Sequence, residues 1–439
     1  MLGADAILLA LVVAAAQPAR DTLSQPFEAA TDGEATAVVY AGCARCAWGE
    51  KDREAAALRI SLDGGYSQHL LLARGAGPNE YRITLGRVTK GPHTLSLERD
   101  PALSAKNAGV AEISAVTVDV VAGDGDDFLA RSMAPILHAR PNTVGKFTDL
   151  PILMWYEVTP TARGRQFRYS VIFTNEDGGT ATDRLMATWG RTTDIEFVYG
   201  VELDNAGRLV AEEFQGPGHE VPAFKGQHER GHPLLWVSTD NNMVSESGPT
   251  RVRYAPAPER FDLTNVSREE VMDRHPWSYV LMAKEMRREG KIADGAAVKS
   301  GKIQDLRRYV FVEGCGEVGD AALALAVSIR RPVDAEEWVV SDRGDPKFRI
   351  VRDGCFRAAI PLPPGPRPQD ILALHAIAYA RPPADGEAPA PHGTVRLTRI
   401  NKVFLLDREY LPGPSLLQWQ GDVTITAGGP SLDLPFPIR

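Results

Sequence analysis

The run ALRISLDGGYSQHLLLA, residues 57–73, decides the fold class of this chain. Apolar side chains recur at Leu58, Ile60 and Leu62, with the period of two that marks a half-buried β-strand. Asp63 and Gly64 then supply a turn before a second β-rich run. The pattern predicts an antiparallel hairpin inside a β-sandwich.

Similar β-rich runs, separated by turn residues, continue through the rest of the sequence. We therefore expect a mostly β protein of three consecutive β-sandwich modules, with a short helical segment between the second and the third. DRLMATWG, residues 183–190, is expected to be one strand of the second module, and Pro276 to kink or divide the helical segment. The expected boundaries are a signal peptide at 1–19, a first sandwich at 27–122, a central sandwich at 128–260, a helical linker at 261–304 and a last sandwich at 305–439.

Composition narrows the range of partners. The 439 residues exceed one ordinary core, and 44% hydrophobic with 24% charged residues is typical of folded proteins. There are 49 basic and 57 acidic residues, a net charge of −8, and no basic run that could neutralise a row of phosphates. Nucleic acid is excluded as an expected partner.

The amino terminus predicts export. Its apolar run from Ala6 to Ala16 is too short to span a bilayer and ends in small residues, with Ala19 as an alternative cleavage position. The competing interpretation is a first helix of the mature fold. We expect a secreted or periplasmic protein with no membrane span after removal of the leader.

The four cysteines of an exported chain are expected to pair. A bridge between Cys315 and Cys355 would join two strands of the last module. Cys43 and Cys46 form a C-x-x-C that fits a local disulfide, a redox pair or half of a zinc site. A small structural loop is the favoured interpretation.

The first module resembles carbohydrate-binding modules of the galactose-binding-like type. The resemblance lies in the order of its turns and strands: Asp63-Gly64, then YRITLG at 81–86, then GPHTL at 91–95. It implies a sandwich on which exposed aromatic side chains stack against sugar rings. Trp48, Tyr66 and Tyr81 are the candidates, and each is equally compatible with ordinary packing inside a β-sheet.

The middle region is faintly similar to the vacuolar-protein-sorting-62-type domain. The similarity rests on Asp194-x-Glu196 in a strand, Gln215-x-x-x-His219 after the next strand, and a His-Pro pair at 232–233. It implies an architecture and no settled activity.

His228-Glu-x-x-His232 has the spacing of a zinc-peptidase motif, which functions only on a helix. Gly231 and Pro233 oppose a helix, so we expect a polar loop that enters a strand. The two histidines stay candidates for a divalent metal, zinc or calcium, and the cofactor is otherwise unknown. AGDGDDF, residues 122–128, is interpreted as a solvated linker rather than half of a calcium loop.

Acidic residues of the central module carry the main functional hypothesis. Asp194 and Glu196 lie two apart on one strand, so both face the same side, while Ile195 and Phe197 point into the core. Two carboxylates on one face fit the general acid and the nucleophile or base of a glycosidase. The predicted catalytic set is Asp194, Glu196, Glu176 and His219, with Trp189 and Asn241 as further sugar contacts.

The leading prediction is a secreted protein that binds an extracellular polysaccharide or glycan and hydrolyses it in the central module. No Gly-x-Ser-x-Gly elbow supports a serine nucleophile. Two alternatives remain open: a non-catalytic extracellular protein that binds a glycan or a protein, and a metal-dependent hydrolase built on the histidines.

Overall fold

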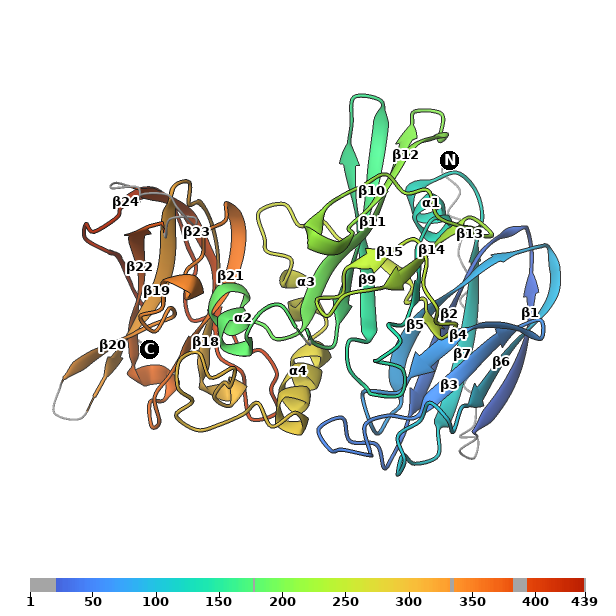
Figure 1. Cartoon of the computed structure of the whole chain (residues 1–439), viewed down its shortest axis with the longest axis horizontal. Coiled ribbons are helices and arrows are strands. Elements are labelled where there is room, and N and C mark those ends of the chain that lie inside the picture. Colours follow the sequence, from blue (N-terminus) through green and yellow to red (C-terminus); the bar gives the residue numbers. More distant parts are fainter. Residues whose placement is uncertain (1–20, 177, 332–334, 382–392, 438–439) are drawn as a thin grey trace, which may run out of the picture.

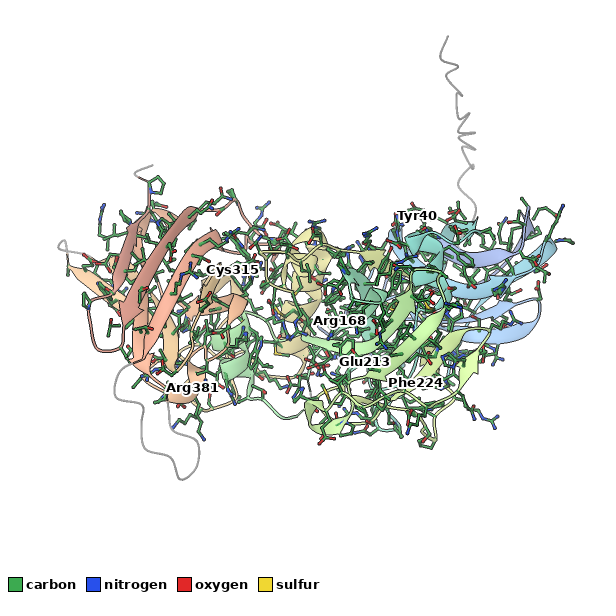
Figure 2. The ribbon with its side chains drawn as sticks, turned by 90° about the horizontal axis from the view of Figure 1, so that it is seen from above. Tyr40, Arg168, Glu213, Phe224, Cys315 and Arg381 are labelled. Carbon is green, nitrogen blue, oxygen red and sulfur yellow. A yellow bond between two sulfur atoms is a disulfide. The ribbon has the colours of Figure 1, made fainter. Side chains whose placement is uncertain are left out.

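The computed structural model describes residues 21–176, 178–331, 335–381 and 393–437. Within these ranges the chain is mostly β, with pairs of sheets in three successive parts of the sequence, which confirms the predicted fold class (Figure 1). Seen from above, the three parts follow one another along the long axis (Figure 2). The predicted leader lies outside the described residues.

The N-terminal sandwich packs two antiparallel sheets around one core. Its β3–β4 hairpin turns at Asp63 and Gly64, whose φ angles of 51° and 77° suit these two residue types. β1 starts at Thr22 and pairs with β6, so the sandwich begins before the predicted residue 27. One sheet contains β1 (Thr22–Ala29), β6 (Gly91–Arg99), β3 (Ala57–Leu62) and β4 (Gly65–Leu71), and the other β5 (Asn79–Val88), β2 (Gly33–Gly42) and β7 (Glu112–Val121).

The central module is a second sandwich whose larger sheet is covered on both faces. Met154 and Tyr156 of that sheet pack toward the smaller sheet, whereas Leu153 and Trp155 pack toward the helices. The strand order in the larger sheet is β12 (Leu209–Phe214), β11 (Asp194–Asp204), β10 (Gly164–Phe173), β9 (Pro151–Pro160) and β17 (Pro258–Arg260). The smaller contains β13 (His228–Glu229), β14 (His232–Val237), β8 (Ile136–His138) and β16 (Arg253–Tyr254), with β15 (Val244–Ser245) on β14.

The expected strand at residues 183–190 is wrong, because this segment forms helix α2 (Thr182–Trp189). Leu185 and Met186 are buried, and Gly190 ends the helix in the left-handed conformation at φ 61°. The helix packs on β21 of the C-terminal part (Figure 1). A segment of eight mixed polar and apolar residues fits a strand and a helix equally well, and tertiary packing decided between them.

Two helices lie between the central and the C-terminal sandwiches. α3 (Glu270–Arg274) and α4 (Trp277–Arg288) meet at Pro276, as the proline predicts (Figure 1). Leu281 of α4 belongs to the N-terminal core, while Met282 packs with Phe311 of the C-terminal part. α4 thus contributes to more than one core.

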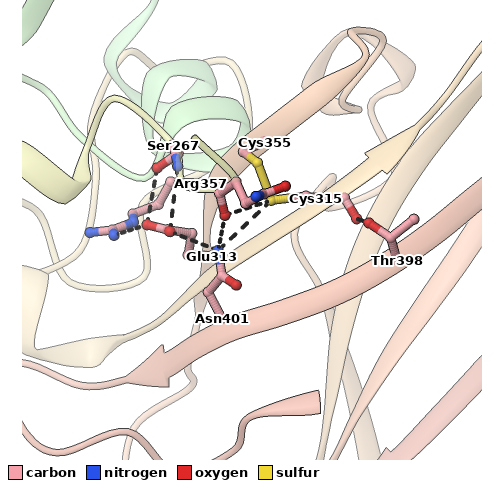
Figure 3. The surroundings of a disulfide bond; sticks show 8 residues. Ser267, Glu313, Cys315, Cys355, Arg357, Thr398 and Asn401 are labelled. Atoms are coloured by element: carbon pink, nitrogen blue, oxygen red, sulfur yellow. Dashed lines mark hydrogen bonds and ion pairs between the residues drawn. A yellow bond between two sulfur atoms is a disulfide. The ribbon is translucent and has the colours of Figure 1, made fainter. Parts of the chain in front are cut away.

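The C-terminal sandwich has four strands in each sheet. Cys315 and Cys355 face each other on neighbouring strands and form the predicted disulfide (Figure 3). Cys43 and Cys46 also form a disulfide, as one of the three interpretations of their C-x-x-C expects. One sheet contains β21 (Gly354–Pro361), β18 (Tyr309–Glu317), β23 (Thr394–Phe404) and β24 (Trp419–Thr426), and the other β20 (Glu336–Val340), β19 (Ala321–Arg330), β22 (Ile371–Ala380) and β25 (Leu432–Pro435).

The segment expected to be a solvated linker is partly helical. Helix α1 (Asp126–Ser132) begins within it, and Asp126 pairs with Arg165 at 2.9 Å. Acidic residues in a first helical turn are stabilised by the helix dipole, which explains the two aspartates without calcium. Within the described ranges, none of the helices has both the length and the apolar composition that crossing a membrane requires.

Candidate functional site

The start of β11 carries the predicted carboxylates. Asp194 is only 2% exposed and Glu196 is half-buried, while Ile195 and Phe197 are buried as expected. Ile195 packs in the core shared with the helices, so Asp194 and Glu196 lie on the opposite face, toward the smaller sheet. A strand with a simply solvated polar face is therefore excluded for Asp194.

Asn242 holds Asp194 in place. Its Nδ2 donates to Asp194 Oδ2 at 3.0 Å and to the carbonyl oxygen of Asn175 at 3.0 Å. Arg191 approaches from the other side, with its Nη1 3.7 Å from Asp194 Oδ1 and its Nε donating to Glu269 at 3.0 Å. The buried carboxylate is thus compensated by an amide and a nearby guanidinium.

A chain of contacts through Gln215 and His219 connects Glu196 to the surface. Gln215 Nε2 donates to Glu196 Oε2 at 2.6 Å and lies 3.2 Å from His219 Nδ1. Gln215 follows β12 and His219 is exposed in a short turn, so the chain reversal after β12 brings both to β11. The side-chain amide of Gln215 therefore links His219 to Glu196.

Glu176 joins this group from the loop after β10. Its Oε1 accepts a hydrogen bond from Thr180 N at 2.9 Å. The loop lies against residues 239–242, because Gly178 N donates to the Asp240 carbonyl at 3.2 Å. A Cβ on Gly179 would stand 2.9 Å from Glu176 Oε1 and 3.5 Å from Asn241 Cβ, so the predicted contact Asn241 lies beside Glu176.

We call Glu176, Asp194 and Glu196 the acid cluster. Burial raises the pKa of Glu196 to about 8 and that of Glu176 to about 7, and the charge of Asp194 is the second cause in both. Burial also raises the pKa of Asp194 itself. Carboxyl groups that keep a proton near neutral pH can act as general acids.

Arg268 is an exposed cation whose charge acts on this cluster. Its charge lowers the pKa of both Asp194 and Glu196. Arg268 is exposed, and in the part of the chain that the structure describes its guanidinium forms no hydrogen bond or ion pair with another residue. Arg268 therefore acts on the acid cluster through its charge and not through a direct ion pair.

The His-Glu-x-x-His segment is a β-hairpin, as its Gly and Pro predict. His228 pairs with Pro233 and Glu229 with His232 across the strands β13 and β14. His228 Nε2 donates to the Glu212 carboxylate at 2.7 Å at the surface, whereas His232 is 1% exposed and its Nε2 lies 3.2 Å from Glu34 Oε2. The two rings contact different neighbours, and the segment lacks the helix that the zinc-peptidase motif requires, as Gly231 and Pro233 predict.

Another acidic group has the spacing of a metal site. Glu270, Asp273 and Glu313 place oxygens within 4.8 Å of one another. However, Arg357 donates to Asp273 at 2.6 Å and also to Glu313, and Lys402 donates to Asp273 at 2.8 Å. These cations already neutralise the group, so its arrangement is explained without a metal.

The aromatic candidates of the first module are not a shared sugar platform. Trp48 is 1% exposed and donates to Glu285 of α4 at 3.0 Å, so its assignment as an exposed stacking residue is wrong. Tyr66 is half-buried between Arg59 and Arg253. The ring of Trp189, the predicted sugar contact of the central module, lies beside Arg352, whose guanidinium carbon is 5.1 Å from the ring centroid.

Tyr81 lines a pocket of about 180 Å³ where the N-terminal sandwich, the central module and α4 meet. We call it the junction pocket. It is bordered by residues from all three parts, among them Arg74, Tyr81, Ile152, Glu259, Trp277 and Leu281. The acid cluster does not line it, so two separate candidate sites exist.

Several contacts of these sites escaped the sequence argument. Gln215 belongs to the Gln215-x-x-x-His219 pattern and Asn242 to a polar run at a strand end, but neither amide has a local signature for its contact with a carboxylate. Arg74 and Trp277 are 203 positions apart but lie together, with the guanidinium carbon 4.9 Å from the ring centroid. Only tertiary structure could pair them.

Comparisons with known proteins give partial matches. No protein-family model matches the chain, and no curated protein does. Among solved structures, the first carbohydrate-binding domain, called CBM36-1, of a multidomain xylanase from the hindgut metagenome of Trinervitermes trinervoides matches 24% of this chain and 75% of its own, at 18% identity and a TM-score of 0.18. The sugar-binding C-terminal domain of EclA matches 25% of this chain and 83% of its own, at 17% identity and a TM-score of 0.18.

A ruminal endo-beta-1,4-mannanase matches 24% of this chain and 19% of its own, at 16% identity and a TM-score of 0.16. At these scores the likenesses are too partial to decide the fold or the function. The resemblance of the middle region to the vacuolar-protein-sorting-62-type domain finds no support among them.

Proposed function

We propose that this chain is an exported carbohydrate-binding protein whose acid cluster hydrolyses glycosidic bonds. The observation that carries the proposal is the raised pKa of two half-buried carboxyls, Glu196 at about 8 and Glu176 at about 7, beside a third acid. Glycoside hydrolysis needs one carboxyl that donates a proton and one that is ionised. The two disulfides accord with export, because such bonds persist in oxidising compartments.

The roles follow from exposure and pKa. Glu196 has the higher pKa and is the proton donor to the leaving oxygen, while Glu176 is the nucleophile or base. Asp194 is too buried to touch a polysaccharide, so its role differs from the direct one expected from sequence: its charge raises both pKa values. Gln215 orients Glu196, and His219 and Asn241 border the opening.

The proposed pair has a defined working range of pH. Above about 7 Glu176 loses its proton, and below about 8 Glu196 keeps its own. The rate of hydrolysis should therefore peak between these values and fall on both sides.

The test is the release of reducing ends from a panel of polysaccharides by the purified chain. Glu196→Gln and Glu176→Gln should each lower the rate by about 100-fold or more, because general acid and base groups contribute factors of that order. Glu213→Gln is the matched control. Glu213 is a half-buried carboxylate of the same sheet, paired with Arg168 at 3.7 Å (Figure 2).

No release from any polysaccharide, or unchanged rates in both acid variants, would contradict the catalytic role. Binding of a glycan without release would favour the non-catalytic alternative.

A further inference from the structure

Arg74 brings a cation without an acidic partner into the junction pocket. Its Nη1 donates to the carbonyl oxygen of Glu80 at 3.0 Å, and its guanidinium lies over the rings of Trp277 and Tyr81. The Glu80 carboxylate is directed elsewhere, accepting from Arg82 at 2.7 Å and from Tyr40 at 2.9 Å. Among the described residues, no carboxylate lies within ion-pairing distance of Arg74.

This environment prepares the guanidinium for an anion. Burial lowers the pKa of Arg74, which reports that its charge is partly removed from water. The two rings flank the guanidinium, and within the described ranges its other N–H groups donate no hydrogen bond to protein. A planar, oriented guanidinium binds a carboxylate through two parallel hydrogen bonds.

The rest of the pocket suits a hydroxylated ring rather than a fatty tail. Glu259 Oε2 and His275 Nε2, 3.1 Å apart, both line the pocket and offer an acceptor and a donor. Leu71, Ile152 and Leu281 form apolar walls that could cover the C–H face of a sugar. Ligand pockets typically combine such walls with a few convergent polar groups.

We propose that the junction pocket binds a carboxylate-bearing sugar, a hexuronate unit, with its carboxylate on Arg74 and its hydroxyls on Glu259 and His275. The proposal rests on the proposed function for the sugar class, and the anionic group follows from Arg74 alone. It makes the glycan of this protein an acidic one, held at a site apart from the acid cluster.

Isothermal titration of the full chain with glucuronate, glucose and benzoate tests this assignment. Glucuronate should bind at least about tenfold more tightly than glucose, because a charged hydrogen-bonded pair contributes that much. Arg74→Gln should remove this preference, whereas Arg59→Gln should preserve it. Arg59 is the matched control, since it lies over the Tyr66 ring at 5.0 Å outside the pocket.

A second measurement does not depend on a folded variant. In the unaltered chain, added salt should weaken glucuronate binding and leave any glucose binding unchanged. Equal affinity for glucuronate and glucose, or no binding of glucuronate, would overturn the proposal. Benzoate binding as tightly as glucuronate would overturn the sugar assignment.

Titrations in the Glu196→Gln background separate this proposal from the catalytic one. Glucuronate binding without polysaccharide hydrolysis in the unaltered chain would refute catalysis alone. Hydrolysis without glucuronate binding would refute the junction site alone.

Discussion

At the scale of single residues, the acid cluster shows how position on one strand becomes chemistry. Asp194 and Glu196 are separated by one residue, yet Asn242 secures Asp194 in the interior while Glu196 stays half-buried beside Gln215. Burial and mutual charge then keep a proton on Glu196 up to about pH 8. The alternation of side chains along β11 places Asp194 and Glu196 on one face of the strand, and this arrangement raises the pKa of Glu196.

The pH dependence of stability offers a direct check of this electrostatic arrangement. The pKa of Glu196 is raised from 4.5 in the unfolded chain to about 8 in the folded one, so the folded chain loses stability as pH rises through this interval. Glutamine carries no charge and escapes the loss. Glu196→Gln should match the unaltered chain near pH 4 and exceed its free energy of unfolding at pH 9 by about 1–3 kcal/mol.

Urea unfolding at a series of pH values measures the difference. Glu229→Gln serves as a control of opposite sign, because Arg253 lowers the pKa of Glu229 and its ion pair stabilises the fold once the unfolded glutamate ionises. A stability difference for Glu196→Gln that is constant from pH 4 to pH 9 would show that Glu196 has an ordinary pKa.

At the scale of elements, the β13–β14 hairpin explains why the His-Glu-x-x-His segment lacks the geometry of a zinc-peptidase site. Arg230 and Gly231 turn the chain with positive φ angles of 54° and 99°, so the segment cannot be the helix that the zinc motif requires. His228 then lies at the surface and His232 under the N-terminal sandwich. The hairpin is a contact between two modules.

The two histidines of the motif should therefore differ sharply when mutated. His232→Ala leaves the buried Glu34 carboxylate and the Ala134 carbonyl without this partner, which should cost about 2–4 kcal/mol of unfolding free energy. His228→Ala, at an exposed position of the same hairpin, should cost less than about 1 kcal/mol. Thermal and urea unfolding give both values, and equal losses accompanied by release of bound zinc would restore the metal hypothesis.

The elements also show what a sequence can reveal. Strands such as β3 and β11 were predictable because their period of two persists and turn residues bound them. Helix α2 was not, because eight residues hold about two helical turns and Gly190 ends a helix or opens a turn equally well. Asp194, Glu196 and Glu176 were predictable as candidates from polar residues at strand ends, whereas Asn242 and Arg74 act through contacts that only the fold creates.

At the scale of the whole molecule, the helical segment is more than a linker. Trp48 of the first module donates to Glu285 of α4, and Arg288 of α4 donates to the Phe147 carbonyl at 2.6 Å. Met286 packs in a core that also holds Phe311 and Phe404 of the C-terminal sandwich. The junction pocket exists because these parts meet, so its shape depends on their relative position.

Arg357 is a buried polar connection between the helical segment and the C-terminal sandwich. It lies fully buried on β21 and donates to Glu313 of β18 (Figure 3). It also donates to Asp273 of α3 and to the Tyr279 hydroxyl of α4. Removing one partner of a buried ionic network leaves uncompensated charge in the interior. Arg357→Leu should therefore lower the free energy of unfolding by about 3–5 kcal/mol.

Because the lost contacts join two parts of the chain, Arg357→Leu should also speed proteolysis of the connecting segment around residues 290–304. Arg396→Leu is the matched control: Arg396 pairs with Asp422 at 2.8 Å on the same sheet but at the surface, so its loss should change little. Urea unfolding measures the change in the free energy of unfolding, and limited trypsin digestion measures the rate of cleavage in the connecting segment. Equal stability of both variants would mean that the apolar core around α4, without Arg357, is sufficient to hold the C-terminal sandwich in place.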